Sequence, residues 1–339
     1  MALQAPHVPN TIETILNTRA ITPEQVLDLR RTVWPDGRIS RPEAELLFEI
    51  NDTMESACGE WRDFFAEGIV AHLVEQATPR GYIDEKDAAW FRDRVLQDGR
   101  IAGETELEAL IQLLEKAAHA PHPLTILALR AVQEAVVAGD HAVLGNAALV
   151  PGELGDPEVA LLRRVLYAKA AGRSNTVSRD EAELLFDLND ATLGADNAPS
   201  WSALFVNAIS NYLLVHSGYE PPSRERMKQV DRWLNQPEDG LAGFGRRMAG
   251  GLATMGRTMQ AMEVFGTETP MESVYRQRLE AGALDRRKAE RVDLCEAVWL
   301  SERIDRDGVL SVNEAALLHF LKASGLTLDK ALSPMMARI

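Results

Sequence analysis

The residues of this sequence best suited to bind an ion lie near its C-terminus, where carboxylates follow the spacing of a calcium-binding loop. Asp305, Asp307 and Glu314 fall at the third, fifth and twelfth positions of an EF-hand loop whose sixth position is Gly308. The first position is Arg303, a cation where a carboxylate ligand belongs. Calcium takes about six to eight oxygen ligands, so this loop alone does not supply a full set.

A second candidate for ion binding is the turn near residue 36, where only Asp36 and Glu43 remain at ligand positions. At the corresponding place further along the chain, Ser174 and Asn175 replace the Asp-Gly pair. The cofactor that these positions predict is calcium or another divalent cation, with the C-terminal loop as the best candidate.

Helix capping explains the same glutamates without an ion. Three serines each stand three residues before a glutamate, the spelling of a capping box in which each side chain bonds the backbone of the other residue. These serines are Ser40, Ser178 and Ser311. Two interpretations of Glu43 and Glu314 therefore stay open, an ion ligand and a helix cap.

Other patterns that indicate catalysis are missing from the sequence. No two histidines have the i, i+4 spacing of a helical zinc site, and no serine sits in a Gly-x-Ser-x-Gly turn. Gly251 to Thr258 has the spacing of a phosphate-binding loop, but the residues before it do not read as the buried strand that the motif requires. We therefore expect a protein that is not an enzyme.

The elements that position these turns come from an internal repeat. Residues 40–52 return as residues 178–190 with ten of thirteen positions identical, at an offset of 138. Trp61 and Phe65 return as Trp201 and Phe205, and we interpret these aromatics as core residues because i and i+4 share a helix face. The sequence predicts a duplication.

Further correspondences are shorter. Residues 307–315 match residues 36–44, which we interpret as half of a third copy. Asp93-Arg94 returns as Asp231-Arg232 at the same offset of 138. In each copy a glutamate and an aspartate seven residues apart share one helix side and predict a small acidic stripe, made of Glu45 with Asp52 and of Glu183 with Asp190.

Apolar residues recur at helical spacing after each capping box, and alternating β-branched runs are almost absent, so the predicted class is all-α. We expect tandem helical bundles at residues 10–138 and 157–265, a linker at 139–156, and a half unit at 270–339. Half a repeat rarely folds alone. It could pack on the second unit, return to the first, or pair with another chain as a homo-oligomer.

Glycines and methionines are interleaved between residues 241 and 269. Residues 241–291 carry nine basic and six acidic side chains inside a chain of net charge −15. Two interpretations stay open: a helix that closes the second unit, and an adaptable bridge whose basic side docks on the acidic units or on a partner.

Composition narrows the class of protein. The 339 residues are 46% hydrophobic, which suits a globular chain, and the acidic excess argues against general nucleic-acid binding. No apolar run approaches the ~20 residues that span a bilayer, and the N-terminus lacks the pattern of a signal peptide. With only two distant cysteines, the expected location is the cytoplasm of a bacterium.

The repeated unit resembles the tellurite-resistance TerB-like family, in which a helix is followed by Asp-Gly-x-Ile-x-x-x-Glu and another helix. The matching residues are Asp36-Gly37-Arg38-Ile39 with Glu43, Asp98-Gly99-Arg100-Ile101, and Asp307-Gly308-Val309-Leu310 with Glu314. The resemblance implies a compact helical bundle with an acidic, metal-associated surface in proteins linked to envelope stress and tellurite tolerance.

Two functions follow as hypotheses. The first is an interaction module whose acidic helical surface binds a protein partner. The second is a divalent-cation sensor that uses Asp305, Asp307 and Glu314.

Overall fold

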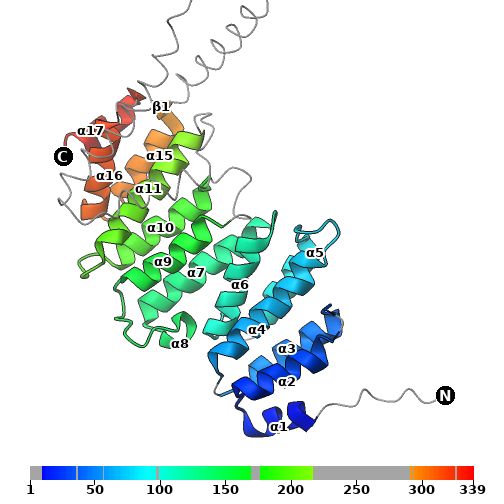
Figure 1. Cartoon of the computed structure of the whole chain (residues 1–339). Coiled ribbons are helices and arrows are strands. Elements are labelled where there is room, and N and C mark those ends of the chain that lie inside the picture. The colour runs from blue at the N-terminus through cyan, green and yellow to red at the C-terminus, as the bar shows by residue number, and fades with distance from the viewer. Residues whose placement is uncertain are drawn as a thin grey trace, which may run out of the picture. The chain divides into compact units, whose positions relative to one another are not determined.

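The protein is all-α over the residues that its computed structural model describes (Figure 1). These are residues 10–35, 37–55, 57–96, 99–168, 176–216, 291–292, 294–324 and 327–339. The predicted fold class is confirmed, since β-structure in these ranges is confined to a two-residue parallel pair, β1 (Arg291–Val292) with β2 (Thr327–Leu328), and isolated bridge residues such as Tyr82 with His119. Asp36, Asp98, Asp231, Arg232 and the glycine- and methionine-rich stretch 241–269 lie outside the described residues.

The chain divides into two compact units, and the first comprises residues 1–153 with 160–173. Its described elements are α1 (Asn10–Thr18), α2 (Pro23–Val33), α3 (Arg41–Thr53), α4 (Gly59–Val70), the π-helical turn η1 (Ala71–Glu75), α5 (Glu85–Val95), α6 (Glu104–Lys116), α7 (His122–Ala138) and α8 (His141–Leu144).

The second unit comprises residues 154–159 with 174–339. Its described elements are α10 (Arg179–Ala191), α11 (Pro199–His216), β1, α15 (Leu294–Ile304), α16 (Val312–Ala323), β2, the 3₁₀ turn η2 (Lys330–Leu332) and α17 (Ser333–Met336). Helix α9 (Asp156–Leu166) begins among the residues of the second unit and ends among those of the first. The division between residues 153 and 154 falls inside the expected linker 139–156.

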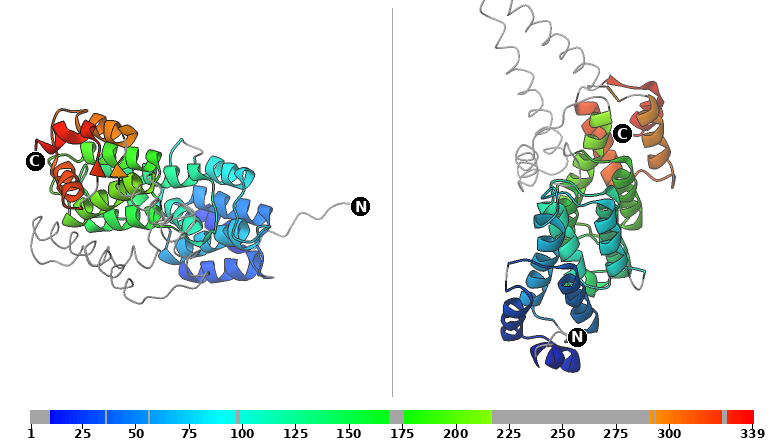
Figure 2. Two further views of the ribbon diagram at one scale, coloured as in Figure 1. Left: turned by 90° about the horizontal axis from the view of Figure 1, so that it is seen from above. Right: turned by 90° about the vertical axis from the view of Figure 1, so that its right-hand side faces the viewer.

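The C-terminal segment packs within the second unit. Helix α16 contacts α11, and β1 contacts both α11 and β2. Figure 2 shows the orange and red C-terminal elements against the green helices α10 and α11 in both views. Of the three packing alternatives that the sequence left open for this segment, the structure shows the first.

Local sequence signals start the helices as predicted. Ser40, Ser178 and Ser311 each form a capping box with the glutamate three residues on, at the starts of α3, α10 and α16. The turn before α16 contains Gly308 at a φ of 72°, a left-handed conformation that glycine adopts without the steric cost other residues meet.

The repeated aromatics form the core, as their spacing predicted. Trp61 and Phe65 of α4 and Trp201 and Phe205 of α11 are fully buried. In each unit the second of these rings meets a phenylalanine of the preceding helix edge to face, a favourable geometry for aromatic pairs. The contact fixes α3 against α4, and α10 against α11.

Within the described residues, each helix is too short or too polar to cross a lipid bilayer.

Candidate functional site

A cluster of a tryptophan, an arginine and two carboxylates joins α3 to α5 in the first unit. The indole N–H of Trp90 donates to the Glu45 carboxylate, whose other oxygen lies 3.2 Å from Nε of Arg94. Arg94 also lies 3.8 Å from a carboxylate oxygen of Asp52, and its guanidinium stands 5.2 Å from the centre of the Phe48 ring. Two helices are thereby joined through one cation.

The same residue types make the same contacts between α10 and α15 in the second unit. Trp299 donates to Glu183, and Nε of Arg303 lies 3.3 Å from the other oxygen of that carboxylate. Arg303 also lies 3.6 Å from a carboxylate oxygen of Asp190 and 5.1 Å from the centre of the Phe186 ring. Helix α15 therefore contacts α10 through the same residue types by which α5 contacts α3.

The predicted acidic stripes thus lie on one helix side, as their spacing implied, but they do not simply face water. Glu45 and Asp52 pair with Arg94, and Glu183 and Asp190 pair with Arg303.

Sequence reasoning missed the arginines and tryptophans of both clusters, although a signal was present. Trp90, Arg94 and Gly99 return as Trp299, Arg303 and Gly308, at an offset of 209 instead of 138. The expected counterpart of Arg94 at residue 232 lies outside the described residues, and within them its contacts are made by Arg303. The larger offset reflects the long stretch of chain between α11 and α15.

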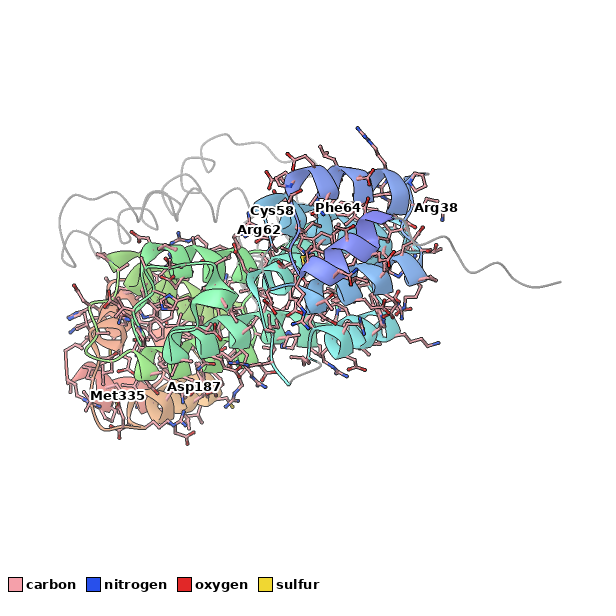
Figure 3. All side chains as sticks on the ribbon, turned by 90° about the horizontal axis from the view of Figure 1, so that it is seen from below. Arg38, Cys58, Arg62, Phe64, Asp187 and Met335 are labelled. Atoms are coloured by element: carbon pink, nitrogen blue, oxygen red, sulfur yellow. The ribbon has the colours of Figure 1, made fainter. Side chains whose placement is uncertain are left out.

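The two clusters differ in how far the cation is withdrawn from water. The side chain of Arg303 is 7% exposed, whereas that of Arg94 is 22% exposed. Asp187, labelled on α10 in Figure 3, adds a third carboxylate at 2.9 Å from Arg303 and also accepts from the exposed Arg306 at 2.8 Å. The deeper burial of Arg303 is accompanied by more carboxylate partners, as the desolvation of a cation requires.

An amide bridge further distinguishes the second unit. The side chain of Asn189 donates to Ser311 at 3.2 Å and accepts from Asn313 at 2.8 Å, which ties the end of α10 to the start of α16. Its counterpart Asn51 accepts instead from the indole N–H of the tryptophan on α4. Because the amide oxygen of Asn189 accepts from Asn313, it does not accept from Trp201. The buried indole N–H of Trp201 has no partner among the described residues.

Of the predicted ion ligands in the first unit, Glu43 acts as a cap. Its carboxylate accepts from the backbone N–H of Ser40 at 2.6 Å. Asp36 lies outside the described residues.

In the C-terminal loop, Asp305 and Asp307 each have a partner. Asp305 accepts from Arg338 at 3.1 Å, and Asp307 accepts from the backbone N–H of Val309 at 2.9 Å. Arg303, at the first position of the loop frame, is directed into the carboxylates of α10.

Glu314 is buried at the start of α16, where it accepts from the backbone N–H of Ser311 at 2.8 Å. Burial raises the pKa of its carboxyl above the ordinary value, and the charges of Asp190 and Asp307 add to the rise. Burial likewise raises the pKa of Asp190, with Arg303 opposing the rise and Asp307 adding to it. Asp190, Asp307 and Glu314 therefore share one electrostatic environment.

The carboxylates of the C-terminal loop do not form a cation-binding site in this arrangement. Across the residues that the structure describes, no group of three or more histidine, cysteine or acidic side chains is placed to hold a metal ion. A hard cation needs about six to eight oxygens, and the loop oxygens are engaged by Arg338 and by backbone N–H groups. What the arrangement does directly is join α10, α15 and α16.

Comparisons with known proteins name no relative, because the chain matches no protein-family model, no curated protein and no solved structure. The resemblance to the TerB-like family stays a prediction that rests on the Asp-Gly motifs.

Replacing Arg303 by methionine should destabilise the second unit more than the matched Arg94→Met change destabilises the first. Removing one member of a buried ion pair leaves partly buried carboxylates without a counter-charge. We expect a loss of about 2–4 kcal/mol for Arg303→Met and about 1–2 kcal/mol for Arg94→Met. Native-state hydrogen exchange of the α15 and α5 amides measures each unit separately, and equal losses would contradict the role given to burial.

The Glu314→Gln variant tests the buried carboxyl by pH. A carboxyl whose folded pKa is raised takes up its proton more readily in the folded chain, so its contribution to the free energy of unfolding rises as pH falls toward its ordinary value of 4.5. Glutamine can still accept from Ser311, so the variant should be at least as stable as the parent at pH 7, and this advantage should shrink at pH 5. Urea unfolding followed by tryptophan fluorescence measures the free energy of unfolding of variant and parent at pH 7 and at pH 5. An equal loss of stability in the variant at the two pH values would mean that the ionised cap matters more than burial.

Proposed function

We propose that the protein is a non-enzymatic helical interaction module that binds a protein partner at the Asp-Gly turn of its second unit. The observation that carries this proposal is a pair of exposed valines beside an exposed carboxylate. Val309 is 52% exposed and Val312 is 68% exposed, on the turn that contains Asp307 and at the first residue of α16. Exposed apolar side chains framed by polar groups are typical of binding sites.

The turn after α5 supplies the comparison within the same chain. At the offset of the Trp-Arg clusters, Val309 corresponds to Arg100. Matched instead as the first residue of its helix, Val312 of α16 corresponds to Glu104 of α6. A charged residue therefore serves the fold at both positions in the first unit. The first unit folds with charged residues at these positions, so this kind of turn does not require valines for its structure. The exposed valines of the second unit therefore support a role in recognition.

The chemistry of the turn favours a partner segment that is basic and carries apolar side chains. Arg306 and Arg338 are paired with Asp187 and Asp305, so Asp307 is the charge presented next to the valines. An acidic rim also steers a basic partner toward the surface and repels nucleic acid, in keeping with the net charge of −15.

The setting that we propose follows from the family resemblance and the composition. It is a stress response of the tellurite-tolerance type in the cytoplasm of a bacterium. A homo-oligomer formed through the C-terminal segment remains a further prediction for the same surface.

The double variant Val309→Arg/Val312→Glu tests the interaction module, because it places the residue types of the first unit on the second. We expect the helical circular dichroism to be unchanged and the recovery of a specific partner from an extract of the native cell to fall about tenfold, the loss that one binding hot spot carries. Val150→Glu, at a valine of the first unit that is 52% exposed, is the matched control and should keep the partner. Recovery of the same proteins in equal yield by the double variant would contradict the proposal.

A divalent-cation sensor is the second candidate, and the shared environment of Asp190, Asp307 and Glu314 favours it. A cation there would offset the mutual repulsion that helps raise two of these pKa values. Binding would require Arg338 to leave Asp305 so that more oxygens converge. Calorimetric titration with calcium should then show heat and a higher melting temperature, both weakened by Glu314→Gln; no heat at millimolar calcium would remove this candidate.

A further inference from the structure

Helix α15 exposes apolar side chains on the side that faces away from Trp299 and Arg303. Leu294 is 58% exposed and Val298 is 39% exposed, and these residues are one helical turn apart. Cys295, between them in the sequence, is also exposed. The opposite side of the helix is buried through Ala297, Leu300 and Ile304.

The matched helix of the first unit carries no such face. At the offset of 209 the counterparts of Leu294, Cys295 and Val298 are Glu85, Lys86 and Ala89. The buried side of α5, in contrast, has apolar residues at the same positions as α15, namely Ala88, Phe91 and Val95. Packing of the helix therefore requires only the buried side, and the apolar residues on the exposed side of α15 need another explanation.

The course of the chain brings a long segment to this face. In the first unit nine residues, 76–84, connect η1 to α5. In the second unit residues 217–290, which are 74 residues and lie outside the described ranges, connect α11 to β1, and α15 begins two residues after β1 ends. Any apolar part of this connection belongs to the same chain as α15, which raises its effective concentration at Leu294 above that of a separate partner.

The sequence of that connection contains a matching apolar stripe. Large apolar residues recur at intervals of three and four from residue 244 to residue 262, the spacing of one helix face. They are Phe244, Met248, Leu252, Met255, Met259 and Met262. Methionine side chains are unbranched and polarizable, which lets them adapt to a small, irregular apolar surface such as that of Leu294 and Val298.

We propose that residues 241–269 of the same chain cover the exposed face of α15. The apolar stripe of the segment removes Leu294, Cys295 and Val298 from water, and the arginines at 246, 247 and 257 stay on its polar side. This inference goes beyond the interaction function proposed above, because it concerns α15 and not the turn at Asp307, and either can fail without the other.

The thiol of Cys295 reports whether the face is covered. In a chain that carries Cys58→Ser, Cys295 is the remaining cysteine and its alkylation by N-ethylmaleimide can be timed. Serine is a favourable helix N-cap, which suits position 58 at the start of α4. Adding Met255→Glu and Met259→Glu should raise the alkylation rate at least tenfold, because a charged stripe cannot stay against apolar side chains.

A second measurement approaches the contact from α15. Leu294→Glu/Val298→Ala, which copies the residue types of α5, should leave the helical circular dichroism unchanged and increase the rate of tryptic cleavage at Arg246, Arg247 and Arg257 about tenfold. Leu193→Glu, at another exposed leucine of the second unit, is the matched control and should not change cleavage.

Alkylation and cleavage rates that do not respond to these changes would overturn the proposal. Protection of Cys295 that disappears on dilution would also overturn it, since a second copy of the chain would then be the occupant of the face.

Discussion

The guanidinium of Arg303 is almost completely withdrawn from water, and the packing of α15 on α10 depends on how that charge is paired. Burying an unpaired cation costs several kcal/mol, and three carboxylates of α10, from Glu183, Asp187 and Asp190, offset this cost. The Phe186 ring lies near the guanidinium and adds a cation–π contact, for which the flat arginine side chain is well suited. Because the three carboxylates belong to one helix and the cation to another, the pairing specifies which helix faces meet.

The same arrangement, with a more exposed cation, holds α5 on α3 in the first unit. Where the two units agree, the residues form the contacts between helices: the aromatic rings, the tryptophan N–H bond to glutamate and the arginine. Several of the residues that differ between the units are exposed or lie at helix starts. The second unit has valines where the first has charged residues at the Asp-Gly turn, and on α15 it has Leu294 and Cys295 where α5 has Glu85 and Lys86. When two units share their buried contacts, the exposed residues of either can differ at little cost in stability.

Most carboxylates that first suggested calcium have structural roles in the described residues. Glu43 and Glu314 cap helices, and Asp305 binds Arg338. Other carboxylates, those of Asp187 and Asp190, neutralise Arg303. This use of acidic groups explains why the part of the chain that the structure describes, although rich in carboxylates, does not assemble an ion cage. The exposed charge at Asp307 and the apolar side chains beside it are the basis of the proposed recognition of a partner.

The sequence by itself determined the features that depend on neighbours a few residues apart. Capping boxes began α3, α10 and α16, Gly308 set the turn before α16, and the i, i+4 aromatics identified the core of both units. Only the tertiary structure decided the pairing of Trp299 and Arg303 with Glu183 and Asp187, across 116 residues. In the sequence Arg303 occupies a ligand position of a calcium loop, yet in the fold it is a buried counter-ion. The physical reason is that a charge takes its role from the helix that packs against it, and with 74 residues between α11 and β1 no local spacing reveals which helix that is.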